Sequence, residues 1–178
     1  MNTTASKITM VRMVLIPVFL IFLYLDMRYW ALAIFIIACA SDALDGYVAR
    51  HYNQVTNFGK FMDPLADKIL VITCMCYYIE CGQMSAWAVA IVILREFAVS
   101  GLRLIAVEQG RVIAAAKSGK LKTGVTMVCL CLMMVMPLWA PSFSPTFDII
   151  CTWLIILTTL YSGFEYFAKN KDVFKDTD

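Results

Sequence analysis

The sequence has few charged residues for its length. Asp, Glu, Lys and Arg make up 16% of its 178 residues, whereas hydrophobic residues make up 61%. This composition is too apolar for an ordinary soluble domain. The chain is long enough for about six helices of roughly 20 residues, the length that crosses a bilayer. We therefore expect an integral membrane protein, with the lipid bilayer as one of its partners.

The chain also has little of what a zinc or disulfide site needs. Its one histidine, His51, follows a predicted helix end, and no two of its seven cysteines form a CxxC pair. Because nearly all of the cysteines lie inside apolar runs, we expect them to be small packing residues. A cleavable signal peptide is not indicated either, because the first apolar run lacks a small-residue cleavage site after it.

Apolar runs predict an all-α integral membrane protein with six transmembrane helices. The boundaries of these helices are predicted to within about four residues. The predicted spans are Ile8 to Leu25, Tyr29 to Val48, Phe61 to Ile79, Ser85 to Val107, Leu121 to Trp139 and Phe147 to Phe167. The connections are short, and no linker, repeat or low-complexity segment divides the chain. We therefore expect a single transmembrane catalytic domain over residues 1–178.

Lysine and arginine predict the orientation of these spans, because they concentrate on the cytoplasmic side of a membrane. One side of the predicted bundle carries Lys7, Arg12, Arg50, Lys60, Lys68, Arg103, Arg111, Lys117, Lys120, Lys122, Lys169, Lys171 and Lys175. The opposite side carries only Arg28 in a loop, and tryptophans fall mainly near the ends of the spans on that side. That basic side is predicted to be cytoplasmic, together with both termini.

Two pairs of aspartates lie near the cytoplasmic ends of the second and third predicted helices. Asp42 and Asp45 are about 60° apart around a helix, and Asp63 and Asp67 about 40° apart. Proline at position 64 is predicted near the start of the third helix, where it costs least. Since the loop between the helices returns to the same surface, both pairs are expected to converge at one depth.

Four carboxylates without histidine or thiolate are the hard oxygen ligands that suit Mg²⁺ or Mn²⁺. A two-metal site with ions roughly 3.5–4 Å apart would neutralise phosphate charge. Small residues at Gly46, Ala49 and Gly59 would let a ligand approach the backbone, and Arg50 can pair with a phosphate oxygen. The alternative is a set of interfacial charges paired with nearby basic residues, Lys60, Lys68 and Arg50.

These residues carry a resemblance to a known family. The pattern is Asp42-x-x-Asp45-Gly46-x-x-Ala49-Arg50-(x8)-Gly59-x-x-x-Asp63-x-x-x-Asp67. It resembles the complete signature of the CDP-alcohol phosphotransferase family, with no motif position missing or replaced. The resemblance implies that an acceptor hydroxyl attacks the lipid-bound phosphate of a CDP-alcohol and that CMP leaves.

The resemblance also implies a role for each motif residue. Metal would be held by Asp42, Asp45, Asp63 and Asp67, with Asp67 also acting as the base that removes the acceptor proton. Donor nucleotide and pyrophosphate would be lined by Gly46, Arg50, Thr56 and Gly59. A carboxylate base is physically plausible because a positioned hydroxyl and a neutralised phosphate lower the basicity that is needed.

A second basic group bears on the acceptor. Arg95 falls near mid-membrane, so it is expected to face a cavity or to pair with Glu96. A cationic pocket near the metals suits an acceptor that carries its own phosphate. The residues predicted to bind that phosphate are Arg95, Arg103, Lys120 and Lys122. For Arg111 and Lys117, ordinary positive charge on the cytoplasmic side is the preferred interpretation.

Further segments resemble the bacterial phosphatidylglycerophosphate synthases. They are Ile8-Thr9-Met10-Val11-Arg12 with Ile16-Pro17, Arg95-Glu96-Phe97, Arg111 to Ala116, and Gly119-Lys120-x-Lys122-Thr123. This resemblance implies CDP-diacylglycerol as donor, sn-glycerol 3-phosphate as acceptor and CMP as a product. It also implies a homodimer in the bacterial inner (cytoplasmic) membrane, with a cytoplasmic active site. A nucleic acid is not expected as a partner.

Other readings remain open from the residues. The acceptor could be serine, which needs no cationic pocket, or an inositol phosphate, which does. A divalent-cation transporter would use the same carboxylates. A transporter would, however, want polar residues through the membrane thickness, whereas here the acids gather at one end and the outer halves of the spans are apolar.

Overall fold

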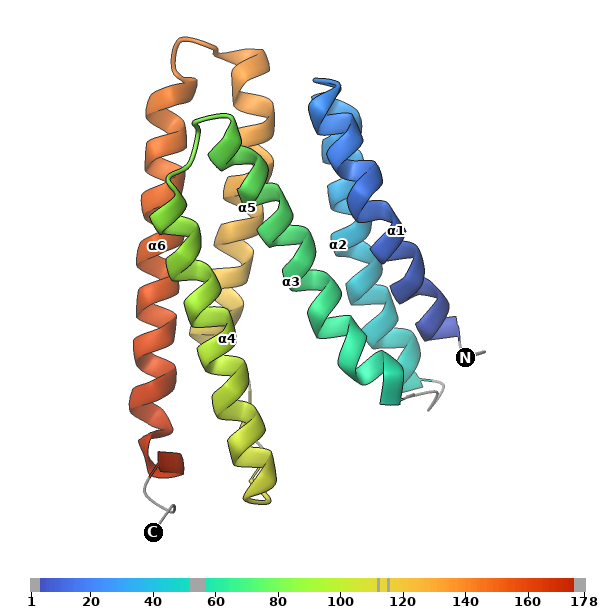
Figure 1. Cartoon of the computed structure of the whole chain (residues 1–178), viewed down its shortest axis with the longest axis vertical. Coiled ribbons are helices and arrows are strands. Elements are labelled where there is room, and N and C mark those ends of the chain that lie inside the picture. Colours follow the sequence, from blue (N-terminus) through green and yellow to red (C-terminus); the bar gives the residue numbers. More distant parts are fainter. Residues whose placement is uncertain (1–3, 52–56, 112, 115, 175–178) are drawn as a thin grey trace. The chain divides into compact units, whose positions relative to one another are not determined.

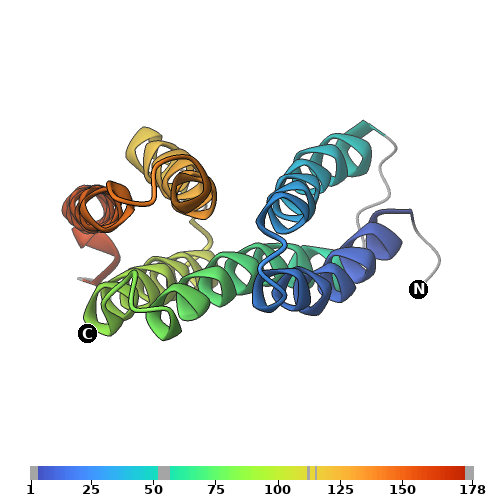
Figure 2. The same ribbon diagram turned by 90° about the horizontal axis from the view of Figure 1, so that it is seen from above.

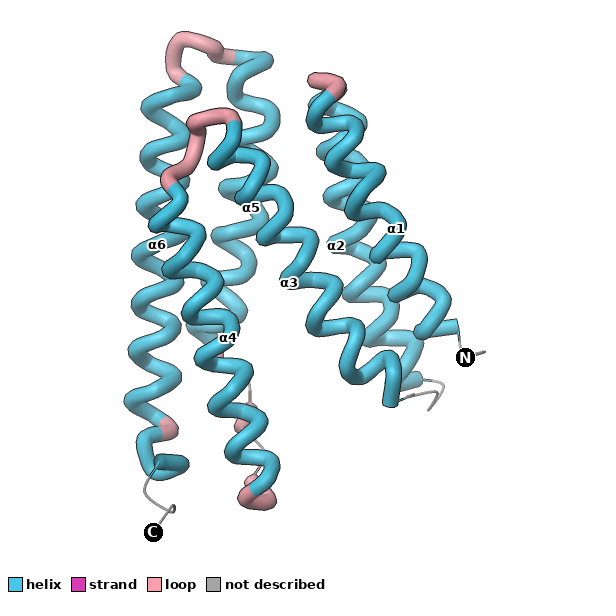
Figure 3. Tube along the Cα trace, viewed as in Figure 1, coloured by secondary structure: helices cyan, strands magenta, loops and turns pink. Residues whose placement is uncertain are grey.

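The computed structural model describes residues 4–51, 57–111, 113–114 and 116–174, with the backbone alone at 4–9, 42–51, 57–64, 66–67 and 174. Figure 1 traces the helices along the chain, and in Figure 3 the described segments are helices and loops, without a strand. The elements are α1 (Thr4–Tyr24), α2 (Arg28–His51), α3 (Asn57–Glu80), α4 (Ala86–Glu108), α5 (Lys117–Trp139), α6 (Ser144–Lys169) and the 3₁₀ helix η1 (Lys171–Phe174).

The all-helical prediction is confirmed, and each long helix matches a predicted span to within four residues at either end. One detail was wrong. Because α3 begins at Asn57, Pro64 falls beyond its first turn. By length and composition, α5 and α6 are the described helices that can cross a membrane. The apolar sequence of helix α4 is interrupted by three charged residues, Arg95, Glu96 and Arg103.

The chain divides into two compact units, Met1–Tyr77 and Tyr78–Asp178. In the first unit, α1 packs against α2, and the two lie side by side in Figures 1 and 2. The rings of Phe19 and Phe35 meet between them at 5.6 Å. Tyr77 of α3 donates a hydrogen bond to the backbone oxygen of Leu23 at 3.2 Å, and its ring stands edge-on to Tyr24. Aromatic packing therefore joins the three helices of this unit at one end.

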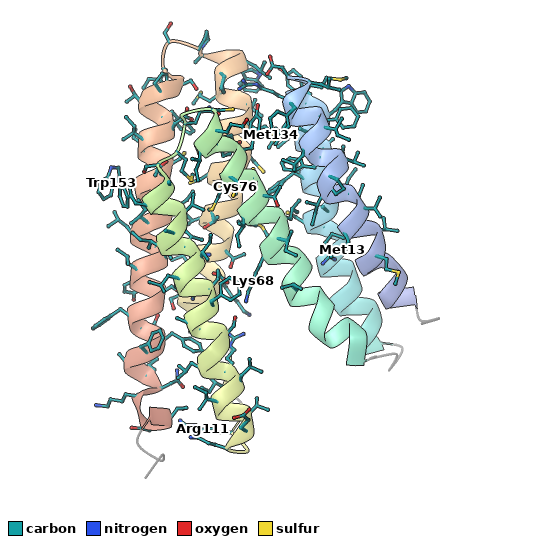
Figure 4. The ribbon with its side chains drawn as sticks, viewed as in Figure 1. Met13, Lys68, Cys76, Arg111, Met134 and Trp153 are labelled. Carbon is teal, nitrogen blue, oxygen red and sulfur yellow. The ribbon has the colours of Figure 1, made fainter. Side chains whose placement is uncertain are left out.

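In the second unit, α6 packs against both α5 and α4. Tyr78 donates a hydrogen bond across the unit to the backbone oxygen of Leu130 at 2.8 Å. Trp87 and Trp153 stack edge-on, with ring centroids 5.7 Å apart. In Figure 4, Trp153 and Arg111 lie toward opposite ends of this unit. One end is thus rich in tryptophan and the other is basic, as expected for two faces of a membrane.

Candidate active site

The four motif aspartates lie on helical backbone, as the spacing predicted. Asp42 and Asp45 belong to α2, and Asp63 and Asp67 to α3. Positions three or four residues apart share one face of a helix, so each pair has a common side. These four side chains, like that of Arg50, lie outside the described residues, and so does the whole of Thr56. Gly46 and Gly59 are described only as helical backbone.

The side chains that are described contain no group of three or more His, Cys, Asp or Glu able to hold a metal ion. The motif aspartates do not belong to that set of side chains. The second unit has its own group of buried charged side chains.

This group is a buried cluster centred on Glu96. Lys122 of α5 donates from Nζ to Glu96 Oε1 at 2.7 Å, and Arg95 donates from Nη1 to the same oxygen at 3.1 Å. The side chain of Lys122 is only 5% exposed and that of Arg95 12%. Arg95 Nη2 also donates to Ser162 Oγ of α6 at 2.5 Å. Helices α4, α5 and α6 therefore meet at a cluster of two cations and one anion.

Two glycines lie beside Arg95 in this cluster, and Gly163 is the one that a side chain would crowd. A Cβ atom on Gly163 would lie 3.3 Å from Arg95 Cγ, and one on Gly119 would lie 3.7 Å from Arg95 Nη2. The first distance is shorter than ordinary van der Waals contact. A methyl group at position 163 would therefore press on the stem of Arg95 and shift its guanidinium group.

Arg103 makes a separate contact about two helical turns further along α4. Its Nε donates to the hydroxyl of Tyr166 on α6 at 2.8 Å, and its guanidinium carbon lies 5.5 Å from the centroid of the same ring. Lys120 is exposed. Of the four residues predicted to bind the acceptor phosphate, Arg95 and Lys122 are thus brought together, whereas Arg103 is held by Tyr166.

A pocket of about 340 Å³ opens at the basic end of the second unit. Its lining includes Tyr166, which connects it to Arg103, and the cations Arg111 and Lys169. Lys169 pairs with Glu165 one helical turn earlier. The full lining is Arg111, Ile113, Ala114, Ala116, Tyr166, Lys169 and Asn170. The pocket is wide enough for a small polar ligand and is lined by two cations.

Comparison with known families decides the relationship of the chain. The model of the CDP-alcohol phosphatidyltransferase family matches residues 2–161. The chain belongs to the CDP-alcohol phosphatidyltransferase family. The match includes the aspartate motif on α2 and α3 and, from the buried cluster, Arg95, Glu96 and Lys122. It confirms the resemblance inferred from the motif.

Curated relatives include bacterial members of this family. The chain is 37% identical to a CDP-diacylglycerol–glycerol-3-phosphate 3-phosphatidyltransferase of Bacillus subtilis, over 97% of both chains. It is 36% identical to a probable phosphatidylglycerophosphate synthase of Mycobacterium tuberculosis, over 93% of this chain and 80% of the relative. It is 35% identical to an Escherichia coli enzyme with the same name as the B. subtilis relative, over 92% of both chains.

Two residues that contact the arginines of α4 were not predicted from the sequence. Ser162 contacts Arg95, and Tyr166 contacts Arg103, both from α6. They belong to a buried stripe on α6 at alternating spacings of three and four residues, which is typical of one helix face. The stripe is Asp148, Thr152, Ile155, Thr159, Ser162 and Tyr166. Polar residues at that spacing in an apolar helix were the sequence signal that could have predicted these contacts.

Proposed function

We propose that this chain is a phosphatidylglycerophosphate synthase. It transfers the phosphatidyl group from CDP-diacylglycerol to sn-glycerol 3-phosphate, giving phosphatidylglycerophosphate and CMP. The observation that carries the proposal is the uninterrupted aspartate motif in a chain that aligns over nearly its whole length with relatives bearing that activity in their names. Both substrates meet at a membrane surface, because the donor is a lipid and the acceptor is soluble in water.

The proposed enzyme is one domain that crosses the bacterial inner membrane six times, with both termini and the active site in the cytoplasm, and it works as a homodimer. Support comes from six helices of 21 to 26 residues. Each is long enough to cross about 30 Å of hydrocarbon at 1.5 Å per residue. The separation of basic and tryptophan-rich ends in the second unit supports the orientation.

The chemistry of the motif fits a divalent metal centre of two Mg²⁺ or Mn²⁺ ions. Asp42, Asp45, Asp63 and Asp67 supply hard oxygen donors on two helices. Bound there, the ions would neutralise the pyrophosphate of the donor and stabilise the departing phosphate. The neighbouring Gly46, Arg50, Thr56 and Gly59 are proposed to bind the nucleotide and pyrophosphate of the donor.

Asp67 is the proposed general base. It accepts the proton of the acceptor hydroxyl as that oxygen forms a bond to the phosphorus attached to diacylglycerol. The bond between this phosphorus and the oxygen of CMP breaks, and CMP leaves with the electron pair. A carboxylate suffices as base because the hydroxyl is held in place and loses its proton as the new bond forms.

The cluster around Glu96 supports an acceptor that carries a phosphate. Lys122 and Arg95 donate to the same Glu96 oxygen, so two cations lie together beside one carboxylate among the described residues. Two adjacent cations suit a phosphate, which would accept charge-assisted hydrogen bonds from them. Arg103 and Lys120 are proposed to complete the acceptor site at its cytoplasmic side. Serine has no phosphate to offer and fits this cluster less well.

An acceptor panel tests the proposal. The purified full chain is supplied with CDP-diacylglycerol and Mg²⁺, and CMP release is measured with sn-glycerol 3-phosphate, glycerol, serine or inositol phosphate. Of the four acceptors, only sn-glycerol 3-phosphate is expected to give rapid release of CMP. Comparable release with glycerol would place the acceptor phosphate elsewhere, and preference for serine or inositol phosphate would reassign the enzyme within its family.

A further inference from the structure

Arg12 on α1 is a charged residue to which the proposed reaction assigns no role. It is only 1% exposed, which makes it one of the largest fully buried side chains that the structure describes. A buried guanidinium group is costly unless a negative group pairs with it. The surroundings of Arg12 in the first unit therefore indicate what it does.

The packing of α1 on α2 has a regular register. Both helices bury one residue every three or four positions, and the two patterns mirror each other across the turn that joins them. The buried positions are Ile16, Phe19 and Leu23 on α1, and Ala31, Phe35 and Ala38 on α2. The 5.6 Å contact between the Phe19 and Phe35 rings fixes the middle of the register.

One further helical step in each direction extends this register to the cytoplasmic end. Four residues before Ile16 is Arg12, which continues the buried stripe of α1. Four residues after Ala38 is Asp42, whose helical backbone occupies the next position at the same spacing on α2. An antiparallel pair that matches Phe19 with Phe35 therefore places positions 12 and 42 at the same level.

We propose that Arg12 is a positioning residue for the aspartate motif and holds the carboxylate of Asp42. This inference rests on the proposed metal centre. A carboxylate that ligates a metal is commonly oriented by a hydrogen-bonding partner behind it, and loss of the partner typically weakens metal binding about 10–100-fold. A planar guanidinium group suits that task, because its paired N–H groups match a carboxylate. Arg12 would fix Asp42 before metal and donor arrive.

Metal binding by the purified, metal-free full chain in detergent gives the first test, with Mn²⁺ titrated and followed by electron paramagnetic resonance. Arg12→Met should weaken Mn²⁺ binding about tenfold or more, and Arg12→Lys should weaken it less. Arg28→Met is the matched control. Arg28 is an arginine of the same unit and lies at the first residue of α2, at the other end of that helix from Asp42, where it pairs with Asp26. This control substitution should leave Mn²⁺ binding unchanged.

Thermal unfolding of the same variants in EDTA gives a second measurement, which does not need a metal. Arg12→Met should lower Tm in the otherwise unmodified chain, but not in a D42N background, where no buried carboxylate is left unpaired. In a D67N background the loss of Tm should persist. If Arg12→Met does not fold, Arg12→Lys is compared in the same three backgrounds.

Unchanged or tighter Mn²⁺ binding by Arg12→Met would overturn the proposal. So would an equal loss of Tm in the unmodified and D42N backgrounds, because Arg12 would then fill space or serve another partner. Failure of the metal centre itself has a different signature. In that case the unmodified chain binds no Mn²⁺, or D42N binds it as well as the unmodified chain does, while the Tm coupling between Arg12 and Asp42 can still be read.

Discussion

Lys122 of α5 donates a 2.7 Å hydrogen bond to Glu96 of α4, and this contact is buried where the helices meet. The same Glu96 carboxylate also accepts a hydrogen bond from Arg95. Lys122 is therefore held in a fixed position rather than left to move on a flexible side chain. A cation fixed in this way can bind an anion with little further loss of side-chain entropy.

Replacement of Lys122 tests the acceptor site. Lys122→Met should raise the KM for sn-glycerol 3-phosphate roughly tenfold or more, because a hydrogen bond to a charged group is worth about 1.5–3 kcal/mol. The KM for CDP-diacylglycerol should change little. Lys117→Met is the control on the same helix, since Lys117 is exposed. Steady-state kinetics with each substrate varied in turn would make the comparison, and equal losses for both substrates would contradict it.

Glu96 should matter for stability as well as for the acceptor. Glu96→Gln leaves Lys122 and Arg95 buried without their shared carboxylate, which is expected to cost on the order of 3 kcal/mol. Tm in detergent should fall, and the acceptor KM should rise. The matched control is Glu108→Gln, at an exposed position at the end of the same helix. A Tm equal to that of the control would show that the cluster does not stabilise the protein.

Gly163 offers a test by steric pressure. In Gly163→Ala, the new methyl group lies 3.3 Å from Arg95 Cγ and must displace it. Overpacking of this kind typically costs about 1–3 kcal/mol, and the shifted guanidinium should lower kcat/KM for the acceptor. Gly101→Ala is the control, because nothing lies within 4 Å of its Cβ position. Identical kinetics for the two variants would remove Arg95 from the acceptor site.

The sequence predicted six helices and the position of the motif on them, because apolar length and aspartate spacing are local features. It also predicted that Arg95 would face a cavity or pair with Glu96, since a mid-membrane charge avoids lipid, and the structure shows the pairing. It did not predict Ser162 or Tyr166, whose contacts with Arg95 and Arg103 depend on how α6 packs against α4. Its prediction that Arg103 binds the acceptor phosphate stays a prediction, and the structure adds the contact with Tyr166. Contacts between distant segments depend on tertiary structure, which spacing along the chain does not encode.

Asp67→Asn should separate the base from the other motif aspartates. Turnover should fall strongly while CDP-diacylglycerol binding is largely kept, because a base acts mainly in the transition state. Asp42→Asn, Asp45→Asn and Asp63→Asn should instead show a dependence on Mg²⁺ or Mn²⁺ concentration shifted to higher values, since each removes a proposed ligand. Donor binding by equilibrium titration, alongside CMP release across metal concentrations, distinguishes the two patterns. Lost donor affinity with preserved turnover in Asp67→Asn would show that its role was misassigned.

The central claim is that this family member makes phosphatidylglycerophosphate by direct transfer. The most direct measurement follows both products from the purified full chain in lipid nanodiscs, with CDP-diacylglycerol, sn-glycerol 3-phosphate and Mg²⁺. We predict that CMP and phosphatidylglycerophosphate appear in equal amounts, and that neither forms without the acceptor or after chelation of the metal. Release of CMP without acceptor, or a lipid product other than phosphatidylglycerophosphate, would contradict the account.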